Sequence, residues 1–207
     1  MPRIKVPRKS TAIDMTAMCD VAFLLLTFFI LTATARQPEP LPVDTPSSTT
    51  KFKQPTTDIA TLTIGGKGKV FFNVAGPAIR MRTLELMSER YGVPFSVDDK
   101  KRFSLIETFG VDISNLKKVI DMNSADRNKE GLQPGIPLDS VGTNPSELYN
   151  WVHNARVATK EINGTSLRFS IKGDSKEQYP TIKKVIDIFQ SDEVTKFSLI
   201  TALEAAD

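Results

Sequence analysis

The chain has 207 residues, enough for one folded domain with extensions, and its hydrophobic content of 40% is ordinary for a globular protein. Its net charge is +3, but Arg3, Lys5, Arg8 and Lys9 place +4 within the first ten residues. A nucleic-acid binder spreads its basic residues over a folded face, so this tail argues against nucleic acid as a partner. The single cysteine, Cys19, excludes an intramolecular disulfide and a thiolate metal cluster.

Residues 17–35 form an apolar run in which Asp20 is the only charged residue. A helix of this length rises about 28 Å, close to the hydrocarbon thickness of a bilayer. We therefore predict a cytoplasmic basic tail over residues 1–12 and a single transmembrane helix over 13–35, with the rest of the chain on the far side of the membrane. The alternative is a cleaved signal peptide, because Ala33-Thr34-Ala35 is an A-x-A pattern. The length of the run and the early aspartate favour a retained anchor.

The polar residues of this run fall on one face of the predicted helix. At 100° per residue Thr16, Asp20, Thr27 and Thr34 project within about 40° of one another. Threonines in a span commonly bond back to their own helix, which accounts for Thr27 and Thr34. An ionised carboxylate in a span costs about 2.5–3.5 kcal/mol on insertion scales. Asp20 is therefore a candidate functional group, with snorkelling to the nearby interface as the alternative.

The segment from Ile13 to Leu26 resembles the signature of the ExbD/TolR family, which reads Thr-Pro-x-x-Asp-Val before a Leu-rich span. Thr16, Asp20 and Val21 match this pattern, and Ala17 replaces the usual proline. The resemblance implies that Asp20, assisted by Thr16, takes up and releases protons as they run down the gradient.

The resemblance also implies the partners and the location of the chain. It implies an inner-membrane subunit, with an ExbB/TolQ-like multi-span oligomer enclosing the helices of a homodimer. A TonB- or TolA-like transducer would receive the resulting motion. The N-terminus would be cytoplasmic and the C-terminal domain periplasmic. No cofactor is implied.

Residues 36–58 are rich in Pro, Ser and Thr and predict an extended linker, with a reach of roughly 60–70 Å. A passive spacer is one reading of this segment, and an ordered state in part of the working cycle is the other. Leu41-Pro42 is loosely similar to a short element of the family's linker.

Residues 59–207 predict a small mixed domain, so the expected fold class is α+β with an anchor helix. A β-hairpin is expected over 59–64 and 69–73, with the intervening glycines as its turn, and a helix over 79–91. Near the end, a strand over 166–172, a helix over 180–190 and a strand over 197–201 predict a crossover unit. This order is similar to the family's periplasmic domain.

Residues 92–163 have no counterpart in the shorter family members and are expected to be an insert. Helical spacing appears over 103–109 and 114–122, and a long loop is expected over 123–142. Asn144, Pro145 and Glu147 predict the cap, first position and third position of a further helix, which would bury Leu148, Trp151, Val152, Ala155 and Ala158. We expect the insert to form an added layer on the sheet, with a partner-binding surface as the alternative.

No catalytic or metal site is indicated. Asp121, Asn123 and Asp126 hint at a calcium loop, but the glycine and glutamate that such a loop requires are missing. His153 is the only histidine, so a zinc site or a His-based triad has no partners, and we expect its side chain at or near the surface. The chain is therefore expected not to be an enzyme.

Three functions follow from these observations. The first is a proton-driven subunit of an ExbB–ExbD–TonB-type complex that powers TonB-dependent import through the outer membrane. The second is a TolR-like subunit of an envelope-integrity complex that contacts peptidoglycan. The third is a membrane-anchored scaffold or binding module in which Asp20 has no proton role.

Overall fold

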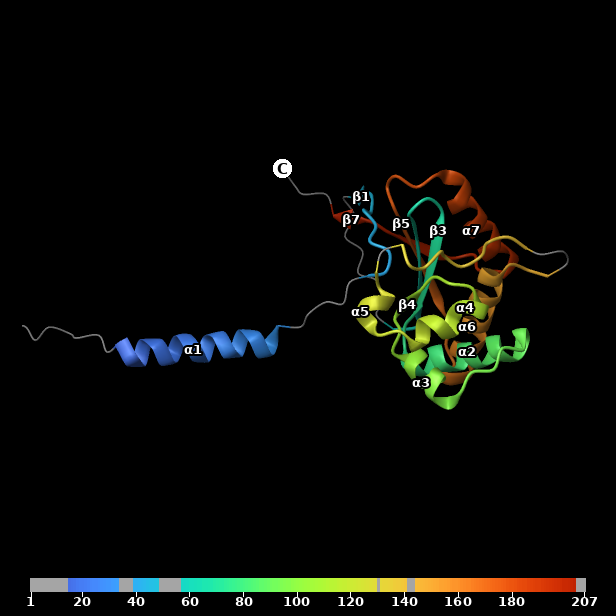
Figure 1. Cartoon of the computed structure of the whole chain (residues 1–207). Coiled ribbons are helices and arrows are strands. Elements are labelled where there is room, and N and C mark those ends of the chain that lie inside the picture. Colours follow the sequence, from blue (N-terminus) through green and yellow to red (C-terminus); the bar gives the residue numbers. More distant parts are fainter. Residues whose placement is uncertain (1–14, 34–38, 49–56, 130, 141–143, 204–207) are drawn as a thin grey trace, which may run out of the picture. The chain divides into compact units, whose positions relative to one another are not determined.

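The computed structural model describes residues 15–33, 39–48, 57–129, 131–140 and 144–203 (Figure 1). The chain divides into two compact units, residues 1–37 and residues 38–207. The first contains α1 (Met15–Thr32). The second is an α/β domain with the following elements: β1 (Ser47–Ser48), β2 (Ile59–Gly65), β3 (Lys69–Val74), α2 (Pro77–Tyr91), α3 (Val97–Ser104), β4 (Thr108–Phe109), α4 (Ile113–Asp121), α5 (Ser124–Arg127), α6 (Glu147–Asn163), β5 (Arg168–Gly173), α7 (Tyr179–Ser191), β6 (Phe197–Ile200) and β7 (Ala202–Leu203).

The domain is built on a mixed five-stranded sheet of order β4-β3-β2-β5-β6. The β2–β3 hairpin is antiparallel, and its turn is closed by Gly66, Lys67 and Gly68, all at positive φ. Strands β5 and β6 pair in parallel across α7, and β5 pairs in parallel with β2. The mixed α/β class, the hairpin, the helix at α2 and the strand–helix–strand unit are all as the sequence predicts.

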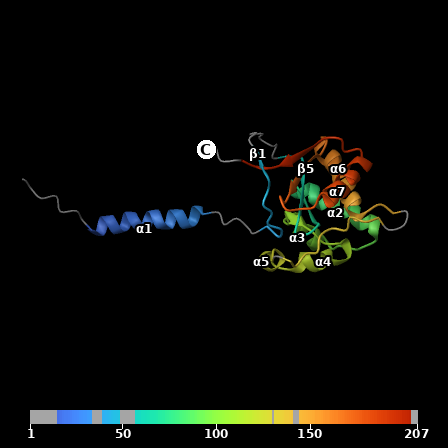
Figure 2. The same cartoon turned by 90° about the horizontal axis from the view of Figure 1, so that it is seen from above.

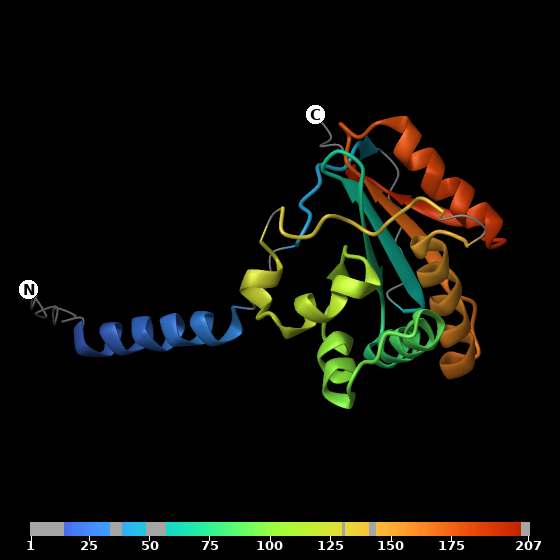
Figure 3. The ribbon, with the colours of Figure 1, turned by 45° about the vertical axis from the view of Figure 1, so that its right-hand side comes forward.

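The helices gather in two groups around this sheet. In Figure 2, α6 and α7 lie at one side of the domain and α4 and α5 at the other. Figure 3 shows α6 and α7 along one flank of the sheet. Helix α6 buries the residues expected of it: Leu148, Trp151, Val152, Ala155 and Ala158. Trp151 contacts Phe109 of β4, with ring centroids 4.7 Å apart, so α6 and the β4 edge share one core.

Two local predictions in the expected insert are wrong. The helix expected over 103–109 ends at Ser104, and Thr108–Phe109 instead pairs with β3 as strand β4. A capping box starts α3 earlier, because the Ser96 hydroxyl accepts from the Asp99 amide and the Asp99 carboxylate accepts from the Ser96 amide. The spacing looked helical because Phe103 of α3 and Phe109 of β4 are both buried in the same core, although they belong to different elements.

The cap of α6 is also displaced from the expected position. Asn144 lies outside the helix, and Ser146 is the N-cap, with its hydroxyl accepting from the Tyr149 amide at 3.2 Å. Serine caps as well as asparagine does, and the hydroxyl that reaches the third amide decides the start. The long loop expected over 123–142 contains the short helix α5 and is otherwise irregular where the structure describes it.

Part of the expected linker lies against the domain. Leu41 is buried, and a Cβ added to Gly65 would meet Val43 at 2.6 Å, so this segment packs closely on the β2–β3 turn. The Ser175 amide donates to the Asp44 carbonyl at 2.8 Å, and β1 pairs in parallel with β7. Residues 39–48 therefore pack against the α/β domain. Residues 36–38 and 49–56 lie outside the described residues.

Candidate proton-coupling helix

Helix α1 is an 18-residue segment in which Asp20 is the only Asp, Glu, Lys, Arg or His residue. By length and composition, α1 is long enough and apolar enough to cross a membrane. In a bilayer every backbone polar group must be satisfied within the segment, which a continuous helix achieves. The predicted tail over 1–12 and the predicted start of the span at residue 13 lie outside the described residues.

No side chain of α1 is buried. The Thr27 hydroxyl donates to the Leu24 carbonyl at 3.0 Å, and the Thr32 hydroxyl donates to the Phe28 carbonyl at 2.7 Å. These threonines therefore satisfy their own polarity inside the helix, as expected of Thr27. Thr34, expected on the same face, lies outside the described residues.

The structure places Thr16, Asp20 and Thr27 on one continuous helix. Thr16 and Asp20 are one turn apart, and Asp20 and Thr27 are separated by about two turns. Phe23 projects onto the same face between them, so an aromatic ring divides the stripe. The polar group nearest to Asp20 on this face is thus the Thr16 hydroxyl rather than that of Thr27.

The chemistry available on this helix is that of one carboxylate. In a low-dielectric setting a carboxyl group is stable when neutral, and it ionises when it meets water or a polar partner. Coupling those two states to two orientations of the helix would make protonation a switch. The described part of α1 holds no second acidic or basic side chain that would fix Asp20 in one state.

The α/β domain carries a half-buried carboxyl at Glu147, the first residue of α6. Its Oε1 accepts from the Ile113 amide at 2.8 Å and from the Trp151 indole N–H at 3.2 Å. It therefore caps the start of α4 and orients the central tryptophan. Burial raises the pKa of Glu147, and these two hydrogen bonds oppose that rise only in part.

This environment predicts a pH-dependent effect of Glu147→Gln. A carboxyl whose pKa is raised by folding destabilises the folded state when it ionises, so stability falls as pH rises from the ordinary value of 4.5 through the folded pKa. Glutamine keeps an oxygen that can accept both hydrogen bonds and never ionises. We expect its advantage in free energy of unfolding to grow between pH 4.5 and pH 7, as measured by urea denaturation.

Glu147→Ala is the matched comparison for that measurement. It leaves two donors without an acceptor and is expected to cost roughly 1–3 kcal/mol at either pH. Equal pH profiles for the wild-type chain and Glu147→Gln would contradict the assignment of a raised pKa to this carboxyl.

The hinted calcium residues have local structural roles. Asn123 caps α5 by accepting from the Asp126 amide at 2.8 Å, and Asp126 pairs with Lys129 at 2.7 Å. Among the residues that the structure describes, no group of three or more His, Cys, Asp or Glu side chains is placed to hold a metal ion.

His153 is partly exposed, as expected, but it has a partner that the sequence analysis did not identify. Its Nδ1 lies 2.7 Å from Asp192 Oδ1, at the end of α7. Asp192 also pairs with Arg156, three residues further along α6. The basic stripe of α6 was visible in the sequence as His153, Arg156 and Lys160 at helical spacing. The buried aspartate 39 residues beyond His153 gave no local signal.

An apolar helix carrying one carboxylate, joined to a separate α/β domain, defines a membrane-anchored protein with a single span. The chain matches the family model described as biopolymer transport protein ExbD/TolR over residues 7–204, nearly its whole length. It belongs to the ExbD/TolR family. No curated protein and no solved structure matched the chain.

Family membership and the anchor helix together make this a single-pass inner-membrane protein and an energy-transducing subunit of biopolymer transport. Its membrane partners are proteins of the ExbB/TolQ type. Members of the family are accessory proteins of transport rather than enzymes.

Proposed function

We propose that this chain is the ExbD-type subunit of a proton-driven complex that powers TonB-dependent import through the outer membrane. In this proposal Asp20 takes up and releases protons, and the Thr16 hydroxyl one turn away assists it. The observation that carries the proposal is the single carboxylate of α1. Moving one charge across 100 mV yields about 2.3 kcal/mol, enough to bias a conformational step.

The surface of α1 supports an enclosing partner. All of its side chains are exposed in this chain, including a carboxylate that lipid does not solvate. An ExbB/TolQ-like oligomer around the helices of a homodimer would provide a polar surface for Asp20 and an apolar one for the leucines and phenylalanines. A TonB-like transducer would then receive the motion from the α/β domain.

Deletion of the gene tests this function. The mutant is expected to grow normally on free iron but not on haem, siderophore-bound iron or cobalamin at limiting concentration, and a plasmid copy is expected to restore growth. Normal growth on all of these nutrients would overturn the proposal. Detergent sensitivity with normal growth would instead support the TolR-like role. A mutant with neither defect would support the role of a membrane-anchored scaffold.

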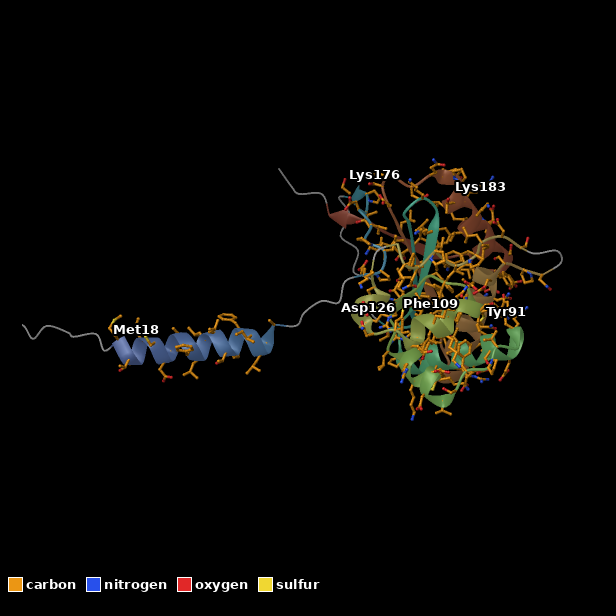
Figure 4. All side chains as sticks on the ribbon, viewed as in Figure 1. Met18, Tyr91, Phe109, Asp126, Lys176 and Lys183 are labelled. Carbon is orange, nitrogen blue, oxygen red and sulfur yellow. The ribbon has the colours of Figure 1, made fainter. Side chains whose placement is uncertain are left out.

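The orientation we propose is a cytoplasmic N-terminus and a periplasmic α/β domain, from the four basic residues before the span. It predicts that Lys176→Cys, made in a Cys19→Ser background, reacts with a membrane-impermeant maleimide in intact spheroplasts. Lys176 is exposed on the domain (Figure 4). Ser10→Cys in the same background is expected to react only after lysis. The reverse pattern would contradict this orientation.

A further inference from the structure

A cleft of about 780 Å³ opens beside α6, on the part of the domain where β5 and β6 begin. One wall is the stripe of α6 that includes Tyr149, His153, Arg156 and Lys160. The other walls are residues 164–167, which lead into β5, and residues 191–196, which connect α7 to β6. We name it the α6–α7 cleft. Its volume is in the range of sites that hold small ligands or a few peptide residues.

The base of the α6–α7 cleft is organised by a buried carboxylate. The Asp192 side chain is 3% exposed, and its two oxygens pair with Arg156 Nη1 at 2.6 Å and with His153 Nδ1 at 2.7 Å. The Asp192 carbonyl also accepts from Arg156. These contacts hold the guanidinium and the imidazole in place. Asp192 is thereby committed to internal partners and is not an acceptor for a ligand.

The groups left at the rim are mainly donors. Lys160 and Lys196 are exposed and form no ion pair with any described residue, whereas Glu193 is the only other carboxylate lining the cleft. The last carbonyls of α7 are already used, since the Asp192 and Val194 amides donate to them. Hydroxyls of Ser166 and Thr195 complete the rim, whereas the Thr165 hydroxyl already donates to Asp58 Oδ2 at 2.9 Å. This excess of donors and positive charge fits a ligand that carries carboxylates.

Apolar and aromatic side chains lie between these donors. Val157, Leu167 and Val194 line the cleft, and the rings of Tyr149 and His153 lie parallel within 6° at a centroid distance of 6.0 Å. A free phosphate would use the donors but leave these surfaces uncovered. The methylenes of Glu and Asp side chains and the planes of peptide bonds would cover them.

We propose that the α6–α7 cleft binds an acidic peptide segment of a partner protein, with Lys160 and Lys196 pairing with its carboxylates. This inference goes beyond the proposed function and does not depend on Asp20, because the cleft lies wholly within the α/β domain.

The test uses the full-length chain in a non-ionic detergent at 150 mM salt. The probe is a fluorescein-labelled hexapeptide of alternating Ala and Glu, and its Ala–Gln counterpart is the uncharged comparison. Binding is followed by fluorescence anisotropy. We expect the Glu peptide to bind at least tenfold more tightly than the Gln peptide, and to lose about tenfold in affinity with Lys160→Glu/Lys196→Glu.

The matched control is Lys176→Glu/Lys183→Glu, which makes the same change in net charge elsewhere on the domain. Both of these lysines are exposed and lie outside the cleft (Figure 4). We expect this control to retain the wild-type affinity for the Glu peptide. Equal losses in the two double variants would reduce the effect to net charge and overturn the proposal.

Two further results would also overturn it. One is the absence of peptide binding up to 1 mM when far-UV circular dichroism shows a folded chain. The other is displacement of the probe by soluble peptidoglycan fragments but not by unlabelled Glu peptide, which would assign the cleft to the cell wall.

Discussion

Asp20→Asn is expected to reduce growth on haem, siderophore-bound iron or cobalamin to the level of a strain that lacks the chain. Asparagine has nearly the same size as aspartate, but its side-chain amide does not ionise and so cannot take up and release a proton as a carboxyl group does. The proposed switch would therefore stay in one state. Growth curves on each limiting nutrient, with protein level checked by immunoblot, measure the effect. A snorkelling role predicts little change, because asparagine is also satisfied at a membrane interface.

Three comparison variants separate charge from shape in this experiment. Asp20→Glu keeps a carboxyl group one methylene further out and is expected to retain partial growth. Thr27→Val removes a hydroxyl that bonds to the Leu24 carbonyl of its own helix and is expected to grow normally. Asp126→Asn changes a half-exposed carboxylate of α5 and is the control for loss of charge in general. Normal growth of Asp20→Asn with normal protein level would contradict the ExbD-type role.

Trp151→Ala is expected to lower the free energy of unfolding of the α/β domain by about 3–5 kcal/mol. The Trp151 side chain is fully buried, and its ring packs against Phe103 and Phe109 from two other elements. Removing it opens a cavity at the point where α3, β4 and α6 meet, and Glu147 loses one of its two donors. A loss of this size is a large part of the 5–15 kcal/mol typical of a folded protein.

Urea denaturation followed by far-UV circular dichroism measures this loss. Trp151 is the only tryptophan, so fluorescence reports on the wild-type chain but not on the variant. Leu105→Ala is the matched control, since Leu105 is an apolar residue that is 74% exposed, and its cost is expected to stay within about 0.5 kcal/mol. Similar losses for the two variants would show that this aromatic cluster is not the core that holds the expected insert to the sheet.

The local elements of the domain were predictable because each has a signal within its own segment. Hydrophobic spacing marked α2, α4 and α7, and the glycines at 66 and 68 marked the hairpin turn. The stripe of α1 required only the helical repeat. Such signals depend on neighbours three or four residues away, so one sequence is enough to reveal them.

The features that the sequence did not reveal depend on long-range contacts. Strand β4 exists because Phe109 pairs with Phe72 of β3, and two residues are too few to show an alternating pattern. The docked segment 39–48 reads as a linker by composition. It is held by contacts distant in sequence, since Leu41 and Val43 lie against the glycines at 65 and 66 and the Asp44 carbonyl accepts from the Ser175 amide. The pairing of Asp192 with His153 and Arg156 joins α6 to the end of α7, and no local residue spacing in the sequence indicates it.

The parallel pairing of β2 with β5 has a consequence for how the protein is made. Ile59 pairs with Arg168, so the centre of the sheet closes only after more than a hundred further residues have been synthesised. Until β5 arrives, the hairpin presents an unpaired edge of hydrogen-bonding groups, which is a template for wrong pairing with other chains. Contacts so distant in sequence also form slowly. The yield of correctly folded protein therefore depends on how well that edge is protected until β5 arrives.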